Sequence, residues 1–204
     1  MLSVITILKN NKMKNVMFSA IAMAFVLVSC NQKGKEAETT TTEKATTEPV
    51  KETATTQTSQ NTFSINEIVS NYLALKNALT KDDTKGAASA GKTLYATFNA
   101  VNVNSIDAKN KKEYLDIADD AKEHAEHIGA NGGNIPHQRE HFVLLSKDIS
   151  DLIKTFGTTQ KLYQDYCPMA DDGKGAIWIS EVKDIKNPYQ GSKMLTCGSV
   201  KKTY

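Results

Sequence analysis

Two short segments in the C-terminal third of the chain each place a methionine close to a cysteine. They are Cys167-Pro168-Met169 and Met194-Leu195-Thr196-Cys197. Thiolate and thioether sulfurs are soft ligands that select Cu(I), and by the same softness Ag(I). A fold that joins the two segments, the first extended and the second in a tight turn, would form a four-sulfur site for copper(I) or silver(I). Its predicted ligands are Cys167, Met169, Met194 and Cys197.

The same two cysteines permit a different interpretation. Exported proteins usually oxidise paired cysteines, so Cys167 and Cys197 could instead form a disulfide. That bond would close a loop of about 30 residues and stabilise the fold by roughly 3 to 4 kcal/mol on chain-entropy arguments. The two methionines would then fill gaps in the surrounding core. Spacing alone favours neither the metal site nor the disulfide.

All four histidines of the chain lie between residues 124 and 141. His124 and His127 are near the end of one expected helix, and His137 and His141 are near the start of the next. Spacings of three and four residues put each pair on one helical face and permit metal chelation. An antiparallel hairpin would unite all four as a secondary metal site. The alternatives are polar surface histidines and, for His141, a buried hydrogen-bonded side chain.

The elements that would position these residues are mainly helical. Apolar residues repeat every three to four positions and predict four amphipathic helices. The first opens at a capping box, Ser64-Ile65-Asn66-Glu67, and the second follows Asp82-Asp83-Thr84. The third runs from Ser105 to His127, and the fourth starts near Pro136 and ends at Gly157. Short connections predict an antiparallel four-helix bundle.

After Gly157 the pattern changes to short strands separated by turns rich in Gly, Pro and Asp. The expected strands are residues 161–166, 177–180 and 199–204. The predicted fold class is therefore mainly α, with an antiparallel four-helix bundle followed by a small irregular β-rich C-terminal cap. We expect the bundle and the cap to form one metal-binding domain over residues 61–204.

The first 29 residues predict an export signal. Lysines precede an apolar run over residues 16–28 that is short for a membrane span, and the run leads into Leu27-Val28-Ser29-Cys30. This ending resembles the lipobox of bacterial lipoproteins, in which the chain is cut before the cysteine and the cysteine is acylated. The resemblance implies that Cys30 carries a lipid anchor on a bacterial membrane, facing the periplasm. The same resemblance to lipoproteins implies, from Asn31 rather than Asp at this position, the outer membrane over the inner one.

Composition bounds the rest of the chain. Residues 30–60 comprise the lipidated cysteine and a threonine-rich linker, which we expect to be disordered because it has too few apolar residues to bury. The formal charge is +2, from 25 basic and 23 acidic residues, and three of the lysines lie in the signal. A mature chain near neutrality argues against nucleic-acid binding. No phosphate loop, nucleophile elbow or strong acid–base dyad occurs, so we expect no enzyme.

Several separated motifs resemble one family, the domain of unknown function 3347. They are Tyr166-Cys167-Pro168-Met169-Ala170, Gly175-Ala176-Ile177-Trp178-Ile179-Ser180, the segment from Asn187 to Gly198, and Gln138-Arg139-Glu140-His141-Phe142 with Leu145-Ser146. Members of that family occur as exported lipoproteins and as domains appended to adaptor subunits of copper and silver efflux pumps. The resemblance therefore implies periplasmic heavy-metal handling, and it favours metal ligation over a disulfide at the two cysteines.

These observations and the resemblance predict a membrane-tethered periplasmic protein that binds Cu(I) or Ag(I). It would act as a metallochaperone or buffer for heavy-metal efflux. Its expected partner is a heavy-metal efflux adaptor or another periplasmic metal carrier, to which the ion passes by ligand exchange. The alternative is a non-catalytic structural or protein-interaction lipoprotein with a Cys167–Cys197 disulfide.

Overall fold

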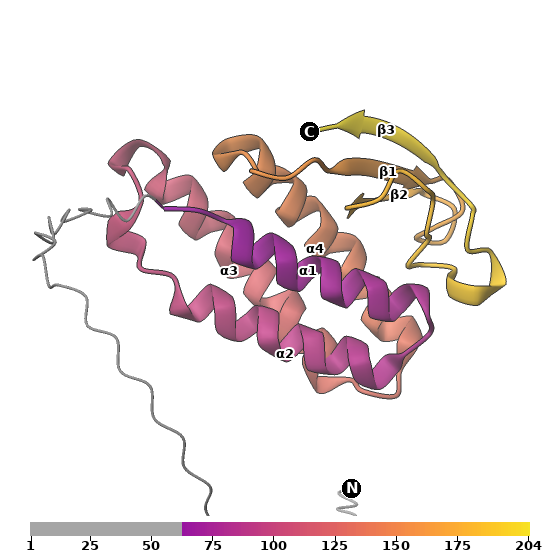
Figure 1. The fold of residues 1–204 in the computed structure, drawn as a ribbon. Coiled ribbons are helices and arrows are strands. Elements are labelled where there is room, and N and C mark those ends of the chain that lie inside the picture. The colour runs from indigo at the N-terminus through magenta and orange to yellow at the C-terminus, as the bar shows by residue number, and fades with distance from the viewer. Residues whose placement is uncertain (1–62) are drawn as a thin grey trace, which may run out of the picture. The chain divides into compact units, whose positions relative to one another are not determined.

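The computed structural model describes residues 63–204 (Figure 1). The predicted signal peptide, Cys30 and the linker lie outside these residues. The helices are α1 (Asn66–Thr80), α2 (Thr84–Ala100), α3 (Ala108–Ala130) and α4 (Ile135–Phe156), with short 3₁₀ turns η1 (Val103–Ser105) and η2 (Gly191–Lys193). The strands are β1 (Tyr163–Cys167), β2 (Ala176–Ser180) and β3 (Ser199–Thr203). A mainly helical bundle with a small β cap is therefore confirmed.

The described helices pack in chain order, α1 against α2, α2 against α3, and α3 against α4 (Figure 1). Gly91 lets α2 approach α3 closely. A Cβ atom at this position would lie 2.9 Å from both the Ala125 carbonyl oxygen and the Gly129 amide nitrogen. Any side chain here would therefore force the two helix backbones apart.

Two of the helix starts test the predicted caps. Asp83 caps α2 as expected, because its carboxylate accepts a hydrogen bond from the Gly86 amide at 2.8 Å. The predicted capping box of α1 is wrong. Its N-cap is Ile65, which is buried in the core, and α1 therefore begins one residue later than the box requires. Ser64 accepts instead from the Asn66 amide at 3.2 Å.

The three strands form one antiparallel sheet in the order β2-β1-β3. Strand β2 faces α4, and a buried polar network joins the sheet to the helices. The Tyr72 hydroxyl of α1 lies 2.8 Å from the Ser146 hydroxyl of α4 and accepts from the Ile179 amide of β2 at 3.1 Å. Within residues 63–204, no helix combines the length and apolar character needed to cross a membrane.

The central strand buries an acid whose oxygens find no partner. Asp165 is 0% exposed, and neither of its carboxylate oxygens is hydrogen-bonded within residues 63–204. Trp178 lies opposite Asp165 on β2, and its buried Nε1 also has no hydrogen-bond partner within residues 63–204. Burial raises the pKa of Asp165 to about 6, although the positive charge of the buried Lys76 opposes this rise.

This burial predicts a pH-dependent stability. Because the folded state holds the Asp165 proton more tightly than the unfolded chain, ionisation destabilises the fold progressively as pH rises from about 4 to about 6. The loss should be on the order of 3 kcal/mol, and Asp165→Asn should remove most of it. Urea unfolding of both proteins at pH 4 and pH 7 measures the difference. If the stability of Asp165→Asn relative to the wild type did not increase from pH 4 to pH 7, the raised pKa of Asp165 would be contradicted.

Candidate metal centre

The helical hairpin α3–α4 brings the four histidines together. His124 and His127 lie in the last two turns of α3, and His137 and His141 lie in the first two turns of α4. The caps fix these turns. Asn134 accepts from the His137 amide at 3.3 Å, and the Asn131 side chain donates to the His127 carbonyl at 2.8 Å.

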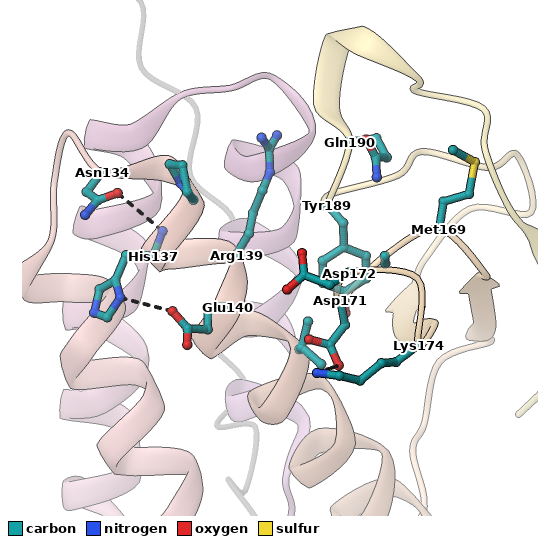
Figure 2. A pocket seen from close by; sticks show the side chains of 13 residues that line it. Asn134, His137, Arg139, Glu140, Met169, Asp171, Asp172, Lys174, Tyr189 and Gln190 are labelled. Atoms are coloured by element: carbon teal, nitrogen blue, oxygen red, sulfur yellow. Dashed lines mark hydrogen bonds and ion pairs between the residues drawn. The ribbon is translucent and has the colours of Figure 1, made fainter.

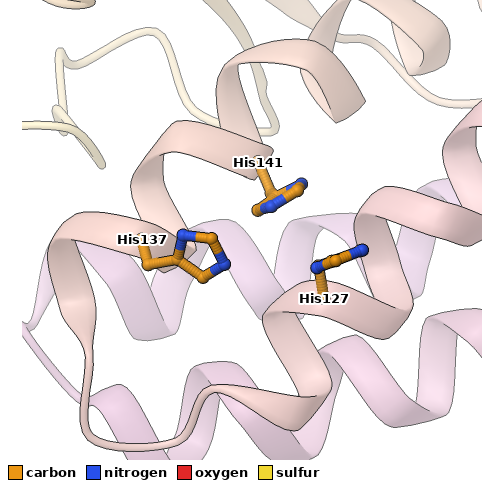
Figure 3. A group of neighbouring side chains, drawn as sticks. All are labelled: His127, His137 and His141. Carbon is orange, nitrogen blue, oxygen red and sulfur yellow. The ribbon is translucent and has the colours of Figure 1, made fainter. Parts of the chain in front are cut away.

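Three of the rings form a group whose size suits one metal ion (Figure 3). His127, His137 and His141 each offer a nitrogen, and these atoms all lie within 4.8 Å of one another. Two nitrogens bound to one tetrahedral zinc lie about 3.4 Å apart, so ring rotations that draw the three nitrogens together by up to roughly 1.4 Å would close the site. His141 is central, with its ring centroid 4.4 Å from that of His127 and 4.7 Å from that of His137.

His124 contacts the same group from the adjacent turn of α3. Its Nδ1 lies 3.2 Å from Nδ1 of His141. Burial lowers the pKa of both His124 and His141, and for His141 the neighbouring histidines lower it further. The neutral imidazole, which is the form that binds metals, is therefore favoured at neutral pH.

The predicted sulfur ligands separate into a close pair and two exposed residues. Cys167, buried at the end of β1, and Cys197, half-buried before β3, are free cysteines whose Sγ atoms lie 2.9 Å apart. Hydrogen bonding to Cys167 raises the pKa of the Cys197 thiol. The predicted tight turn at Met194 is present, because the Cys197 amide donates to the Met194 carbonyl at 3.0 Å.

The methionines lie at the surface. Met169 is 54% exposed and Met194 is 40% exposed. The extended segment predicted through residues 167–169 is wrong, because β1 ends at Cys167 and the Ala170 amide donates to the Cys167 carbonyl at 3.4 Å, which closes a turn. Met169 instead lines a groove of about 670 Å³ and lies across it from His137 (Figure 2).

Comparison with known protein families finds a match for the helical part of the chain. A family model described as a protein of unknown function, DUF3347, matches residues 68–161. This segment belongs to the DUF3347 family. The DUF3347 match runs from α1 through α4 and includes all four histidines, but it ends before β1 and therefore before both cysteines. No curated protein and no solved structure matches the chain.

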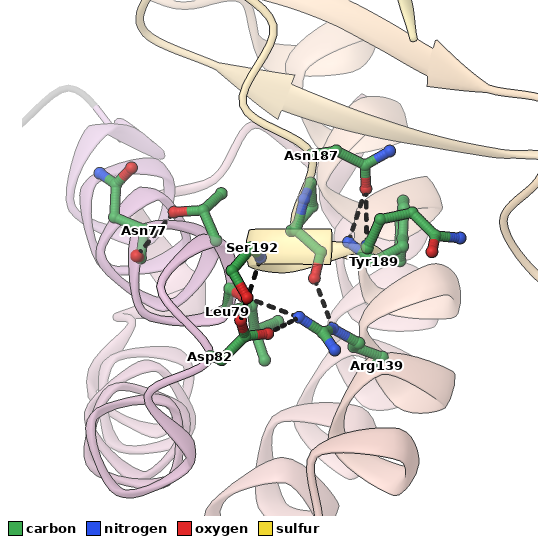
Figure 4. A network of polar contacts seen from close by, with 10 residues as sticks. Asn77, Leu79, Asp82, Arg139, Asn187, Tyr189 and Ser192 are labelled. Carbon is green, nitrogen blue, oxygen red and sulfur yellow. Dashed lines mark hydrogen bonds and ion pairs between the residues drawn. The ribbon is translucent and has the colours of Figure 1, made fainter. Parts of the chain in front are cut away.

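An arginine of the DUF3347 segment anchors the loop that follows β2 (Figure 4). Arg139 of α4 donates to the Pro188 carbonyl at 2.7 Å, to the Leu79 carbonyl at 3.0 Å and to Asp82 at 2.6 Å. Asp82 also accepts from the Ser192 amide at 3.0 Å. These hydrogen bonds, those from Ser192 foremost, lower the pKa of Asp82 to about 2. One guanidinium thus ties α4, the α1–α2 turn and the 188–192 loop together.

Sequence reasoning missed Asp148, which lies beside the DUF3347 histidines. Its Oδ2 lies 4.0 Å from Nε2 of His124 and has no hydrogen-bond partner within the described residues. Burial raises the pKa of Asp148 to about 7. The signal was available in the spacing, because Asp148 follows His141 by two helical turns and therefore shares its face of α4.

Proposed function

We propose that this protein is an exported, membrane-tethered metal-binding protein that acts as a metallochaperone or buffer for heavy-metal efflux. The observation that carries the proposal is the convergence of His127, His137 and His141, whose ligand nitrogens lie within 4.8 Å of one another. Three imidazoles on two helices suit copper, zinc or nickel, and three protein ligands leave a coordination position open. An open position is what ligand exchange with a partner requires.

The cysteine pair supports a second, softer site in the same proposal. Two thiols 2.9 Å apart, with a methionine three residues before one and two residues after the other, offer the sulfur set that Cu(I) or Ag(I) selects. We assign divalent zinc, copper and nickel to the histidines, and the soft monovalent ions Cu(I) and Ag(I) to the sulfurs. A heavy-metal efflux adaptor or another periplasmic carrier would receive the ion.

A titration tests the proposal directly. The full chain, purified in detergent without a histidine tag, should bind Zn²⁺ one-to-one in competition with a chromogenic chelator. Co²⁺ should give the d–d absorption of an imidazole site without thiolate charge-transfer bands. Under anaerobic conditions Cu(I) should bind additionally at the sulfurs. If the folded chain bound none of Zn²⁺, Co²⁺ and Cu(I) more tightly than the denatured chain does, the proposal would be wrong.

The methionines provide a separate prediction for the soft site. Met169→Leu combined with Met194→Leu should weaken Cu(I) binding by at least about tenfold and leave Zn²⁺ affinity unchanged. Stability should change by less than about 1 kcal/mol, because such swaps nearly conserve volume and both side chains are largely exposed. Competition with a Cu(I) chelator measures the affinity. Unchanged Cu(I) affinity in the double variant would remove the methionines from the ligand set.

The sulfur contact also favours a second candidate, a structural or protein-interaction lipoprotein. Cys167 and Cys197 are close enough to be joined by a small movement of either side chain. The native exported protein would then show neither thiol, and reduction would lower stability by roughly 3 to 4 kcal/mol. Thiol counting on protein isolated without reductant separates the candidates, since two free thiols would contradict this one.

A further inference from the structure

The ring of His124 lies between His141 of the histidine group and the carboxylate of Asp148. On one side, its Nδ1 lies 3.2 Å from Nδ1 of His141. On the other side, its Nε2 faces Oδ2 of Asp148 at 4.0 Å. Both side chains are largely buried, with 15% of His124 and 19% of Asp148 exposed. The three residues therefore form a row that leads from the centre of the histidine group into the α3–α4 interface.

The chemistry of imidazole assigns the protons along this row. A neutral ring carries one proton, so the contact between the two Nδ1 atoms needs one donor and one acceptor. If Nε2 of His141 gives its lone pair to a metal, the proton of His141 must be on Nδ1. His141 then donates to Nδ1 of His124, and the proton of His124 must be on Nε2, where it points toward Asp148.

Asp148 is suited to receive that hydrogen bond. Its Oδ2 is buried and has no partner within residues 63–204. A buried acceptor left unpaired is costly, and a small movement of either side chain would bring Nε2–H of His124 into range. Metal-binding histidines commonly donate their second ring nitrogen to such a partner, which fixes the tautomer and the ring orientation.

We propose that His124 is a positioning residue and not a metal ligand. Together with Asp148 it fixes the tautomer and orientation of His141, so that Nε2 of His141 faces the metal. This inference rests on the proposed function, because it assumes that His127, His137 and His141 hold an ion. It gives His124 and the unpaired carboxylate of Asp148 a common role, which is to orient the ring of His141.

The first test uses Zn²⁺ affinity and Co²⁺ absorption of the full chain in detergent. His124→Ala should weaken Zn²⁺ by about 10- to 100-fold, with one-to-one stoichiometry and unchanged Co²⁺ band positions. His124→Asn should restore most of the affinity, because its amide oxygen can accept in place of Nδ1. His137→Ala is the contrasting ligand variant, and it should shift the Co²⁺ bands. Band shifts in His124→Ala as large as those of His137→Ala would make His124 a ligand and overturn the proposal.

A double-mutant cycle tests the role of Asp148. Asp148→Ala should weaken Zn²⁺ less than His124→Ala does, and the double variant should be no weaker than His124→Ala alone, because both residues act through the same ring. Asp151→Ala removes an exposed acid from the same helix and is the matched control, expected to leave affinity unchanged. Additive losses in the double variant would contradict a shared task.

The tautomers of the histidine rings give a second test, because a purely structural role of His124 would not fix the position of its ring proton. The chain contains only four histidines, so ¹⁵N-histidine labelling yields four ring systems. In the Zn²⁺-loaded protein, His141 should be the Nδ1–H tautomer and His124 the Nε2–H tautomer. Zinc on either nitrogen of His124 would overturn the inference. Absence of Zn²⁺ binding by the wild-type chain would instead remove the proposed histidine centre on which the inference depends.

Discussion

Replacing His141 with alanine should abolish tight Zn²⁺ and Cu²⁺ binding, with a loss of more than about 100-fold in affinity. Its ring lies between those of His127 and His137 and also contacts His124. Removing it takes away one proposed ligand and the ring that lies against both of the other two. Loss of a ligand should therefore exceed the 10- to 100-fold effect typical of an outer partner.

The control for this variant is Leu144→Ala, which shortens an exposed side chain on the same helix and should leave metal affinity intact. Competition titration measures both proteins. Thermal unfolding shows whether each remains folded, and Zn²⁺ should raise the melting temperature of the wild type and of Leu144→Ala but not of His141→Ala. Retention of wild-type affinity by His141→Ala would place the metal elsewhere in the chain.

Replacing Arg139 with alanine should destabilise the fold on the order of 3 kcal/mol. The Arg139 side chain is 16% exposed and donates to two carbonyls and to Asp82, so its removal takes one hydrogen bond from each buried carbonyl and the opposite charge from the carboxylate. Arg139→Lys keeps the charge but cannot reach three acceptors at once, so it should recover only a minor part of the loss. Urea unfolding provides the measurement.

A milder variant of the same network is the matched comparison. Asp82→Asn keeps a residue that tolerates the positive φ of 57° at this position and removes only the carboxylate charge. It should cost less than Arg139→Ala. Because the pKa of Asp82 is lowered to about 2, the wild type should lose this contribution as pH falls from about 4 to about 2, and the variant should not. Equal stability of wild type and Arg139→Ala would contradict the anchoring role.

Apolar periodicity was sufficient to predict the helices because each buries a continuous stripe. In α4, Phe142, Leu145 and Ile149 follow the three-to-four spacing and all are fully buried. Helix ends were less predictable. Helix α3 begins at Ala108, three residues after the predicted start, because residues 103–105 form the 3₁₀ turn η1. The side-chain pattern of one 3₁₀ turn resembles that of a first α-helical turn.

The two candidate sites differ in how far they could be predicted. The histidine group needed only helical spacing and a short connection, since a tight hairpin leaves two neighbouring helices antiparallel. The position of Met169 depends on where β1 stops, and periodicity does not show that the chain turns directly after Cys167. The spacing puts Asp148 on the same face of α4 as His141, but its approach to His124 depends on how α4 packs against α3.

The short chain distance between the histidines has a kinetic consequence. His127 and His141 belong to consecutive helices joined by a tight turn, whereas the cysteines meet only after β1 pairs with β3. Bringing the histidines together therefore costs little loop-closure entropy, and the proposed metal centre could form as soon as the hairpin does. An ion held there would link α3 and α4 in the folding transition state. Metal should thus accelerate refolding and not merely slow unfolding.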